Sequence, residues 1–212
     1  MNKKLRTFVY PVCAFIVLLL LWQVCVMLST SEIAFPTPVA VFKEFFYILT
    51  HKVGNYYTVV GHVLWSLSRV LVGFSIAAVL GIILGLTMGW FDYVRAVMMP
   101  IFNLLRPIAP LAWIPLAILW FGIGEKYKYF LIFIAAFVPF TLNAFAGASH
   151  VDKQLVGAAR MLGASKSQLF FEIVGPAAVP SIFSGAQVAL SNSWMTMLAA
   201  EMVCATEGVG WI

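Results

Sequence analysis

Five long apolar runs constrain the fold of this chain more than any other feature of its sequence. They cover about residues 8–28, 63–90, 98–122, 129–146 and 181–203. A hydrocarbon core roughly 30 Å thick is crossed by about 20 apolar residues in a helix, whose backbone hydrogen bonds close within the segment. Of the 212 residues, 63% are hydrophobic and 10% are charged, which excludes an ordinary soluble domain. We predict an all-α integral membrane protein, with residues 1–212 forming one polytopic bundle of five spans.

The basic residues predict how these runs are oriented across the membrane. Three of them stand among the first six residues, and because positive flanks stay on the cytosolic side, we expect a cytosolic N-terminus. The first run is longer than the apolar part of a cleaved signal peptide, which is the alternative for such a start. Residues 91–97 and 147–180 then lie in the cytosol, and residues 123–128 lie on the opposite side. We attribute the net charge of +5 to this orientation bias and to attraction between basic residues and the headgroups of the lipid bilayer. The basic residues form no patterned patch that would predict nucleic acid as a partner.

Glycines recur along one side of the second run. Gly81, Gly85 and Gly89 are spaced by four residues, and Gly73 lies two turns earlier. A stripe without side chains lets another helix approach closely, as in many membrane bundles. This pattern predicts tight helix packing and carries no information about a solute.

The third run contains helix breakers and polar side chains. Its prolines are Pro100, Pro107, Pro110 and Pro115. Proline removes a backbone donor and frees a carbonyl, which a membrane tolerates where the segment lines a cavity, so we expect a kinked or partly unwound helix. Arg106 lies in this run beside Asn103. Two interpretations remain open: Arg106 extends to the headgroups, or it attracts an anion at the cytosolic end of a pore.

The fifth run carries a narrow polar stripe. Ser184, Gln187 and Ser191 fall in one sector of a helical wheel, with Asn192 adjacent to them. These side chains either form hydrogen bonds between helices or contact a hydrated path for a solute. Together with Arg106 they are the candidate pathway residues. Glu201, near the outer end of the run, is expected to be interfacial.

The predicted cytosolic segment 147–180 forms two short amphipathic helical pieces. Gly163 separates them and can supply the positive φ that a sharp turn requires, and Pro176 is expected to end the second piece before the fifth span. A basic amphipathic loop of this kind either rests on anionic lipid or is held by a partner protein. The pattern from the residues alone leaves both open.

The spacing within this loop resembles that of a known family. Ala158-Ala159, Gly163, Ile173 and Pro176 resemble the EAA loop of ABC-importer permeases, whose pattern is Glu-Ala-Ala, three residues, Gly, nine residues, Ile, one residue and Leu-Pro. Two positions depart, because Gly157 replaces the usual Glu and Gly175 replaces the usual Leu.

Further motifs along the chain are similar to the nitrate, sulfonate and taurine branch of these permeases. They are Phe35-Pro-Thr-Pro38, Leu105-Arg-Pro-Ile-Ala-Pro110, Ile114-Pro-Leu-Ala-Ile-Leu-Trp-Phe-Gly-Ile-Gly124, and Ala200-Glu-Met202 followed by Glu207-Gly-Val-Gly210. The resemblance therefore extends over nearly the whole chain.

The resemblance implies a type I ABC-importer permease in the cytoplasmic membrane of a bacterium. Its implied partners are a second copy of the chain, a cytosolic ATPase dimer and an extracytoplasmic solute-binding protein. The residues implied to couple to the ATPase are Gly157, Ala158, Ala159, Arg160, Gly163, Ala164, Lys166, Ile173 and Pro176. Members of the family usually have a further span, so the resemblance implies either a sixth span after Ile212 or a member of the family in which five spans suffice.

The implied function is import of a small anion such as taurine, another sulfonate or nitrate, without catalysis by this chain. Import of a thiamine-precursor pyrimidine, or a secondary transporter or channel, are the alternatives. ATP and Mg²⁺ are expected on the partner ATPase, since the sequence has no G-x-x-x-x-G-K-[ST] loop, and Gly122-Ile-Gly-Glu-Lys126 is too short for one. The spacing of the three cysteines matches no metal motif, so no metal site is expected.

Overall fold

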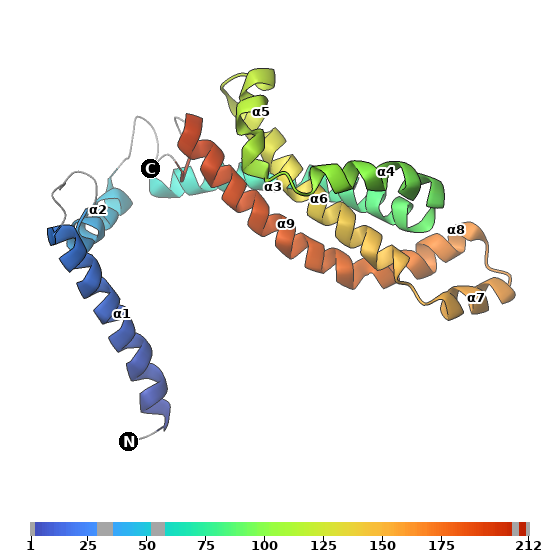
Figure 1. Cartoon of the computed structure of the whole chain (residues 1–212), viewed down its shortest axis with the longest axis horizontal. Helices are drawn as coiled ribbons and strands as arrows, with labels where there is room; N and C mark the ends of the chain where they lie inside the picture. The colour runs from blue at the N-terminus through green and yellow to red at the C-terminus, as the bar shows by residue number, and fades with distance from the viewer. Residues whose placement is uncertain (1–2, 29–35, 52–57, 205–207, 211–212) are drawn as a thin grey trace. The chain divides into compact units, whose positions relative to one another are not determined.

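The computed structural model describes residues 3–28, 36–51, 58–204 and 208–210, and all regular structure in these ranges is helical. Its elements are α1 (Lys3–Leu28), α2 (Pro38–Thr50), α3 (Val59–Trp90), α4 (Asp92–Leu105), the 3₁₀-helix η1 (Pro110–Trp113), α5 (Ile114–Phe121), α6 (Glu125–Ser149), α7 (Lys153–Met161), α8 (Lys166–Gln168), the π-helix η2 (Leu169–Val174) and α9 (Gly175–Cys204) (Figure 1). Contacts divide the chain into two compact units, residues 1–61 and 62–212. Ile212, after which the sixth span is expected, lies outside the described residues.

The predicted spans correspond to long apolar helices. Among the described residues, α1, α3, α6 and the continuous stretch Lys166–Cys204 are each long and apolar enough to cross a membrane, and α4 with η1 and α5 adds a fifth if this bent pair is counted as one span. Helix α6 begins at Glu125, so most of residues 123–128, which were expected on the outer side of the membrane, are helical. Lys128 in this segment is buried.

The third span is two pieces and not one helix over 98–122. Helix α4 begins at Asp92, directly after Phe91, so the predicted cytosolic segment 91–97 is helical. The chain then leaves the helix after Leu105 and resumes at Pro110 with an 87° bend. Two prolines, Pro107 and Pro110, flank this break and offer no backbone N–H, whereas Pro100 is accommodated inside α4. The predicted kink is confirmed, and it is sharp enough to divide the run into two separate helical pieces.

The prediction that Pro176 ends a helix before the fifth span is wrong. The chain is helical from Lys166 through Cys204, and Pro176 lies in the first turn of α9. A proline ring normally clashes with the carbonyl four residues earlier. The π-helical turn η2 immediately precedes it, and its wider i→i+5 bonding gives that carbonyl room. The helix that contains the fifth span therefore begins earlier than residue 181.

The glycine stripe of α3 packs on α6, as predicted. A Cβ at Gly73 would lie 2.9 Å from the Cβ of Ile132, and one at Gly81 would lie 2.8 Å from the Cβ of Phe140. These separations are too short for two side chains, so only glycine permits the observed approach of the two helices. Helix α9 packs along α6 with its own small residues, including Gly185 against Asn143.

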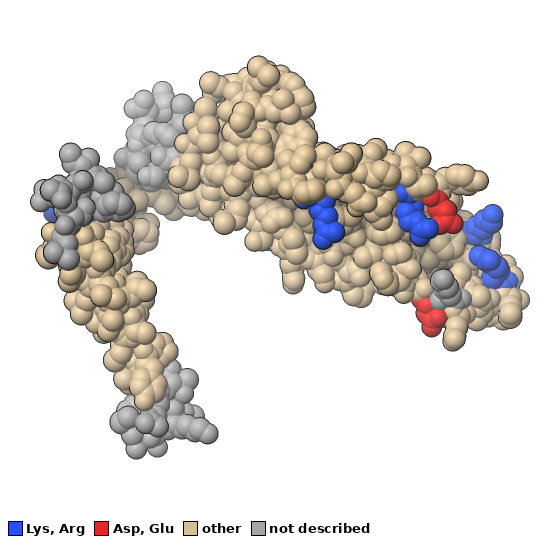
Figure 2. Space-filling view, in the orientation of Figure 1, with Lys and Arg blue, Asp and Glu red and all other residues tan. Residues whose placement is uncertain are grey.

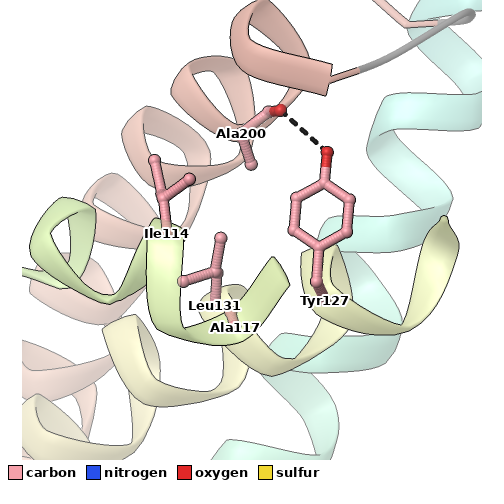
Figure 3. Close-up of a cluster of buried hydrophobic side chains, with 5 residues drawn as sticks. All are labelled: Ile114, Ala117, Tyr127, Leu131 and Ala200. Atoms are coloured by element: carbon pink, nitrogen blue, oxygen red, sulfur yellow. Dashed lines mark hydrogen bonds between the residues drawn. The ribbon is translucent and has the colours of Figure 1, made fainter. Parts of the chain in front are cut away.

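Helix α5 is fixed to α6 and α9 by a small apolar cluster. Ile114 and Ala117 of α5 pack with Leu131 and Tyr127 of α6 and with Ala200 of α9 (Figure 3). The Tyr127 hydroxyl lies 3.0 Å from the Ala200 carbonyl oxygen and 2.8 Å from that of Cys204, so it donates to the last turn of α9.

Replacing Tyr127 with Phe removes this donor without changing the packed volume. We expect a loss of about 1 kcal/mol in the free energy of unfolding, the usual net value of one such hydrogen bond. Thermal unfolding of the detergent-purified protein measures it. Tyr93→Phe is the matched control, because Tyr93 is 90% exposed. Equal melting temperatures for Tyr127→Phe and the wild type would contradict the expectation.

Candidate functional site

A cavity of about 930 Å³ lies beside the break between α4 and η1. Its walls come from α4, the break, η1, α6 and α9. Its polar lining residues are Asn103, Arg106, Asn143 and Asn192. Its aromatic lining residues are Trp113, Phe130, Phe133, Phe137 and Phe145. The cavity is therefore an aromatic-walled space with a few amide groups and one guanidinium group.

Arg106 occupies the break itself. It caps the C-terminus of α4, with its backbone N–H donating to the Phe102 carbonyl (2.8 Å), and its side chain is exposed on the surface of this chain. None of the ion pairs among the described residues involves Arg106. An arginine within a span costs about 2.5–3.5 kcal/mol if lipid surrounds it, so this face requires water, polar groups or an anion.

The structure brings two of the five predicted pathway residues to this cavity. Arg106 and Asn192 line it. The other three, Ser184, Gln187 and Ser191, are exposed on one face of α9 and do not line it. Ser184 donates to the Pro180 carbonyl at 3.2 Å.

Asn143 is a cavity residue that sequence reasoning missed. It lies in α6, and its side-chain amide donates to the Pro139 carbonyl at 2.9 Å. A lone amide in an apolar run is the signal that would have found it. Asn103 is the fourth polar residue of the lining, and the sequence already places it one turn before Arg106.

The predicted coupling residues lie on a hairpin made of the short helix α7 and the start of the continuous helix Lys166–Cys204. Gly157, Ala158, Ala159 and Arg160 are in α7, which Asp152 caps by accepting from the Gln154 N–H (2.8 Å). A turn with Gly163 and Ala164 follows. Lys166 begins α8, Ile173 lies in the π-helix η2, and Pro176 lies in α9.

The tip of this hairpin has a defined shape. Gly163 has a φ of +90°, which confirms the predicted positive φ. Ser165 and Gln168 form a capping box that starts the returning helix. Met161 and Leu162 are 92% and 89% exposed, so the tip presents two large apolar side chains. A side chain at Gly157 would meet no atom within 4 Å, so this chain leaves the position of the usual Glu open.

Charged side chains concentrate around the hairpin. Figure 2 shows one face of the molecule, on which most Lys, Arg, Asp and Glu residues gather over the end formed by α7, α8 and the start of α4. Arg160 and Lys166 are exposed there. Buried Leu169 and Val174, with the Phe170 ring 6.0 Å from that of Trp90, anchor the hairpin to the bundle.

A second group of charges lies at the distal end of the bundle, meaning the end away from the hairpin, where α3 and α6 begin and α9 finishes (Figure 1). The Arg69 guanidinium donates to Glu201 (2.8 Å) and to Glu125 (2.9 Å), and Lys128 also donates to Glu125 (2.8 Å). Arg69, Lys128 and Glu201 are buried. Glu201, which was expected near the membrane interface, is buried and accepts hydrogen bonds from α3 and from the segment 208–210.

The segment 208–210 completes this group, which we call the distal cluster. Its three backbone N–H groups donate in order to Nδ1 of His62 (3.1 Å), to Oγ of Ser66 (3.0 Å) and to Oε2 of Glu201 (3.0 Å). The Ser66 hydroxyl lies 2.8 Å from Glu201 Oε1. Sequence reasoning missed the cluster, since Ser66 and Arg69 of α3 are more than 130 residues from Glu201 along the chain.

Comparison with known proteins identifies the relatives of this chain. Residues 77–212 match the family model described as the inner membrane component of binding-protein-dependent transport systems. The chain is 36% identical to the taurine transport system permease protein of Escherichia coli (strain K12), over 90% of this chain and 70% of that protein. It is 39% identical to the nitrate import permease protein of Synechocystis sp. (strain ATCC 27184 / PCC 6803 / Kazusa), over 99% and 79%.

A third relative is the bicarbonate transport system permease protein of Synechococcus elongatus (strain ATCC 33912 / PCC 7942 / FACHB-805), at 33% identity over 99% of this chain and 77% of that protein. All regular structure of the described residues is helical and includes four helices long and apolar enough to span a membrane, which agrees with these matches, so the predicted fold class is confirmed. The chain belongs to the family of inner membrane components of binding-protein-dependent transport systems.

Proposed function

We propose that this chain is the permease subunit of an ATP-driven importer that carries a small anion across the cytoplasmic membrane of a bacterium. Two copies form the membrane part, a cytosolic ATPase dimer binds ATP and Mg²⁺, and an extracytoplasmic binding protein delivers the solute. The family description and the printed names of the relatives support this assignment.

The position of Arg106 is the main structural support for an anionic solute. It is a cation at a helix break, and it lines a cavity together with three amide side chains. Broken helices at solute sites are common in membrane transporters, because the break frees polar backbone groups toward the path. The three named relatives carry taurine, nitrate and bicarbonate, each of which has an anionic group.

A second copy of the chain would complete the path. The polar face of α9, with Ser184, Gln187 and Ser191, is exposed, as is Arg106. Such a face is unfavourable toward lipid tails, and a second copy that covers it would enclose a hydrated route between the two subunits.

The hairpin with α7 and α8 would couple this path to the ATPase. Exposed Met161 and Leu162 provide an apolar tip, flanked by the cations Arg160 and Lys166. An apolar helical tip inserted into a groove on the ATPase is a usual mode of helix recognition. Closure of the ATPase dimer would then move the hairpins and shift the spans between two states.

A thiamine-precursor pyrimidine is the second candidate solute, and the aromatic wall of the cavity favours it. Trp113, Phe130 and Phe133 are suited to stack against a planar ring. Competition between solutes separates the candidates, because a pyrimidine should inhibit taurine or nitrate uptake only if the same path accepts it.

Uptake by proteoliposomes that contain the chain, its ATPase and its binding protein tests the proposal. We expect ATP-dependent uptake of taurine, nitrate or bicarbonate, and we expect Arg106→Gln to reduce the uptake about tenfold or more, since each 1.4 kcal/mol of lost interaction is tenfold. Arg106→Lys, which keeps the charge, should retain part of the uptake. Arg95→Gln is the matched control, because Arg95 is exposed and pairs with Asp92 one turn earlier (3.0 Å).

Two results would contradict the proposal. Uptake that proceeds equally without ATP would indicate a channel or a secondary transporter. Full uptake by Arg106→Gln would remove the role of this residue in the anion path.

A further inference from the structure

The distal cluster is an unusual feature for a membrane bundle and has no part in the cavity. Arg69 and Lys128 bring two positive charges, and Glu125 and Glu201 bring two negative charges, so the four side chains sum to zero. Ionisable residues within membrane spans are rare, and they usually pair with one another where they occur. None of the residues that line the cavity belongs to the cluster.

We propose that the distal cluster is a permanent clamp, which holds the distal ends of α3, α6 and α9 together in every state of the transport cycle. This inference rests on the proposed function, because it describes which part of the permease stays fixed while the path opens and closes. Opening then takes place at the exposed face formed by α4, the break and α9.

The hydrogen bonds of the cluster support a clamp. Arg69 contacts α6 and α9 at once through Glu125 and Glu201. Glu201 receives three donors, from Arg69, from the Ser66 hydroxyl and from the Gly210 N–H. To separate α3 from α9, the buried Arg69 and Glu201 must part without water, whereas the Glu125 side chain that ties α6 to Arg69 is half exposed. Removal of one partner from a buried pair is strongly destabilising.

The backbone around the cluster points to the same conclusion. The segment 208–210 turns back onto α3 with a φ of +127° at Gly208, a conformation that glycine adopts without strain. One turn from Arg69, Gly73 begins the stripe along which α3 and α6 are in direct contact. The clamp is therefore continuous with the close glycine contact between α3 and α6.

The charge balance gives a sharp test with two variants and their combination. Arg69→Met leaves a net charge of −1 in the cluster, Glu201→Gln leaves +1, and the double variant returns to zero with the Glu125–Lys128 pair intact. In Glu201→Gln the new side-chain amide can still accept from Ser66 and Gly210 through its oxygen. Apolar or neutral replacement of both partners of a buried pair is often tolerated.

We expect each single variant to reduce the amount of folded protein recovered from membranes about fivefold or more, and the double variant to lie within about twofold of the wild type, because paired replacement restores neutrality. Size-exclusion recovery and thermal unfolding of the detergent-purified chain measure this. Double-variant recovery as low as that of the single variants would overturn the charge-neutral clamp.

A distance measurement tests whether the clamp is permanent. Spin labels are placed at Leu64 on α3 and Met202 on α9, both exposed, in a chain whose three cysteines are replaced, with one labelled copy per complex. We expect the distance between the labels to change by less than about 2 Å between the nucleotide-free and ATP-trapped complexes, within the range of small helix shifts. A second, longer distance in the ATP-trapped state would show that the cluster opens as a gate and would overturn the proposal.

The two tests also separate this inference from the proposed function. If the wild-type complex fails to import taurine, nitrate or bicarbonate, the anion importer is contradicted. The recovery of the double variant still decides whether charge balance holds the distal ends together, because it requires no transported solute.

Discussion

Replacement of Gly163 with valine is expected to uncouple ATP hydrolysis from uptake while the protein still accumulates in the membrane. Gly163 has a φ of +90° at the tip between α7 and α8, and its N–H donates to the Arg160 carbonyl at 3.1 Å. A β-branched residue with a positive φ destabilises the backbone by about 1–3 kcal/mol, so the turn should adopt another conformation. The exposed Met161 and Leu162 at the tip would then be presented in another orientation.

The matched control is Gly163→Asn, because asparagine tolerates left-handed backbone far better than valine does. A side chain at position 163 would meet no atom within 4 Å, so neither variant should disturb packing. We expect uptake per ATP hydrolysed to fall about tenfold or more in Gly163→Val, since 1.4 kcal/mol corresponds to a factor of about ten. In Gly163→Asn it should stay near the wild-type value. Full uptake by Gly163→Val would contradict a coupling role for this turn.

Replacement of Gly85 with alanine is expected to prevent normal accumulation of the protein in the membrane. A Cβ at this position would lie 2.6 Å from the Cβ of Ala144 and 2.9 Å from the backbone nitrogen of Phe145, and it would also meet the Thr141 carbonyl. Two of these three neighbours are backbone atoms of α6, so no side-chain rotation can relieve the clash. Overpacking of this kind costs about 1–3 kcal/mol or more.

Gly157→Ala is the control for this change, because a Cβ there meets no neighbour within 4 Å. In helix α7 it should be neutral or should stabilise by about 0.4–1 kcal/mol, through the lower entropy of the unfolded chain. Membrane accumulation and the melting temperature in detergent measure both variants. A Gly85→Ala protein as stable as the wild type would show that α3 and α6 do not pack as described.

The helix content and the membrane environment could be predicted from the residues because both depend on local composition. A run of about 20 apolar residues has few ways to satisfy its backbone in lipid other than as a helix, whatever its neighbours are. Gly163 and the prolines of the third run are similar cases, since backbone freedom and the missing N–H are properties of single residues. The spacing of the hairpin residues carried the family resemblance, which the comparisons confirmed.

The relations between distant residues could not be predicted in this way. Prolines at 107 and 110 predict a break, but the 87° bend depends on how α5 packs on α6 and α9. Pro176 looked like a helix end, and only the preceding π-helical turn shows how the helix continues through it.

Arg69 and Glu201 illustrate the same limit for the sites. Each looks like a solvated charge near the end of an apolar run, and only the tertiary structure brings them within 2.8 Å of each other. Arg106 and Asn192 also meet at one cavity only because α4 and α9 both line it with α6. The sequence by itself determined which segments enter the membrane and where the backbone turns, since these depend on neighbouring residues. The tertiary structure decided which polar groups share a site, because that depends on which helix faces meet.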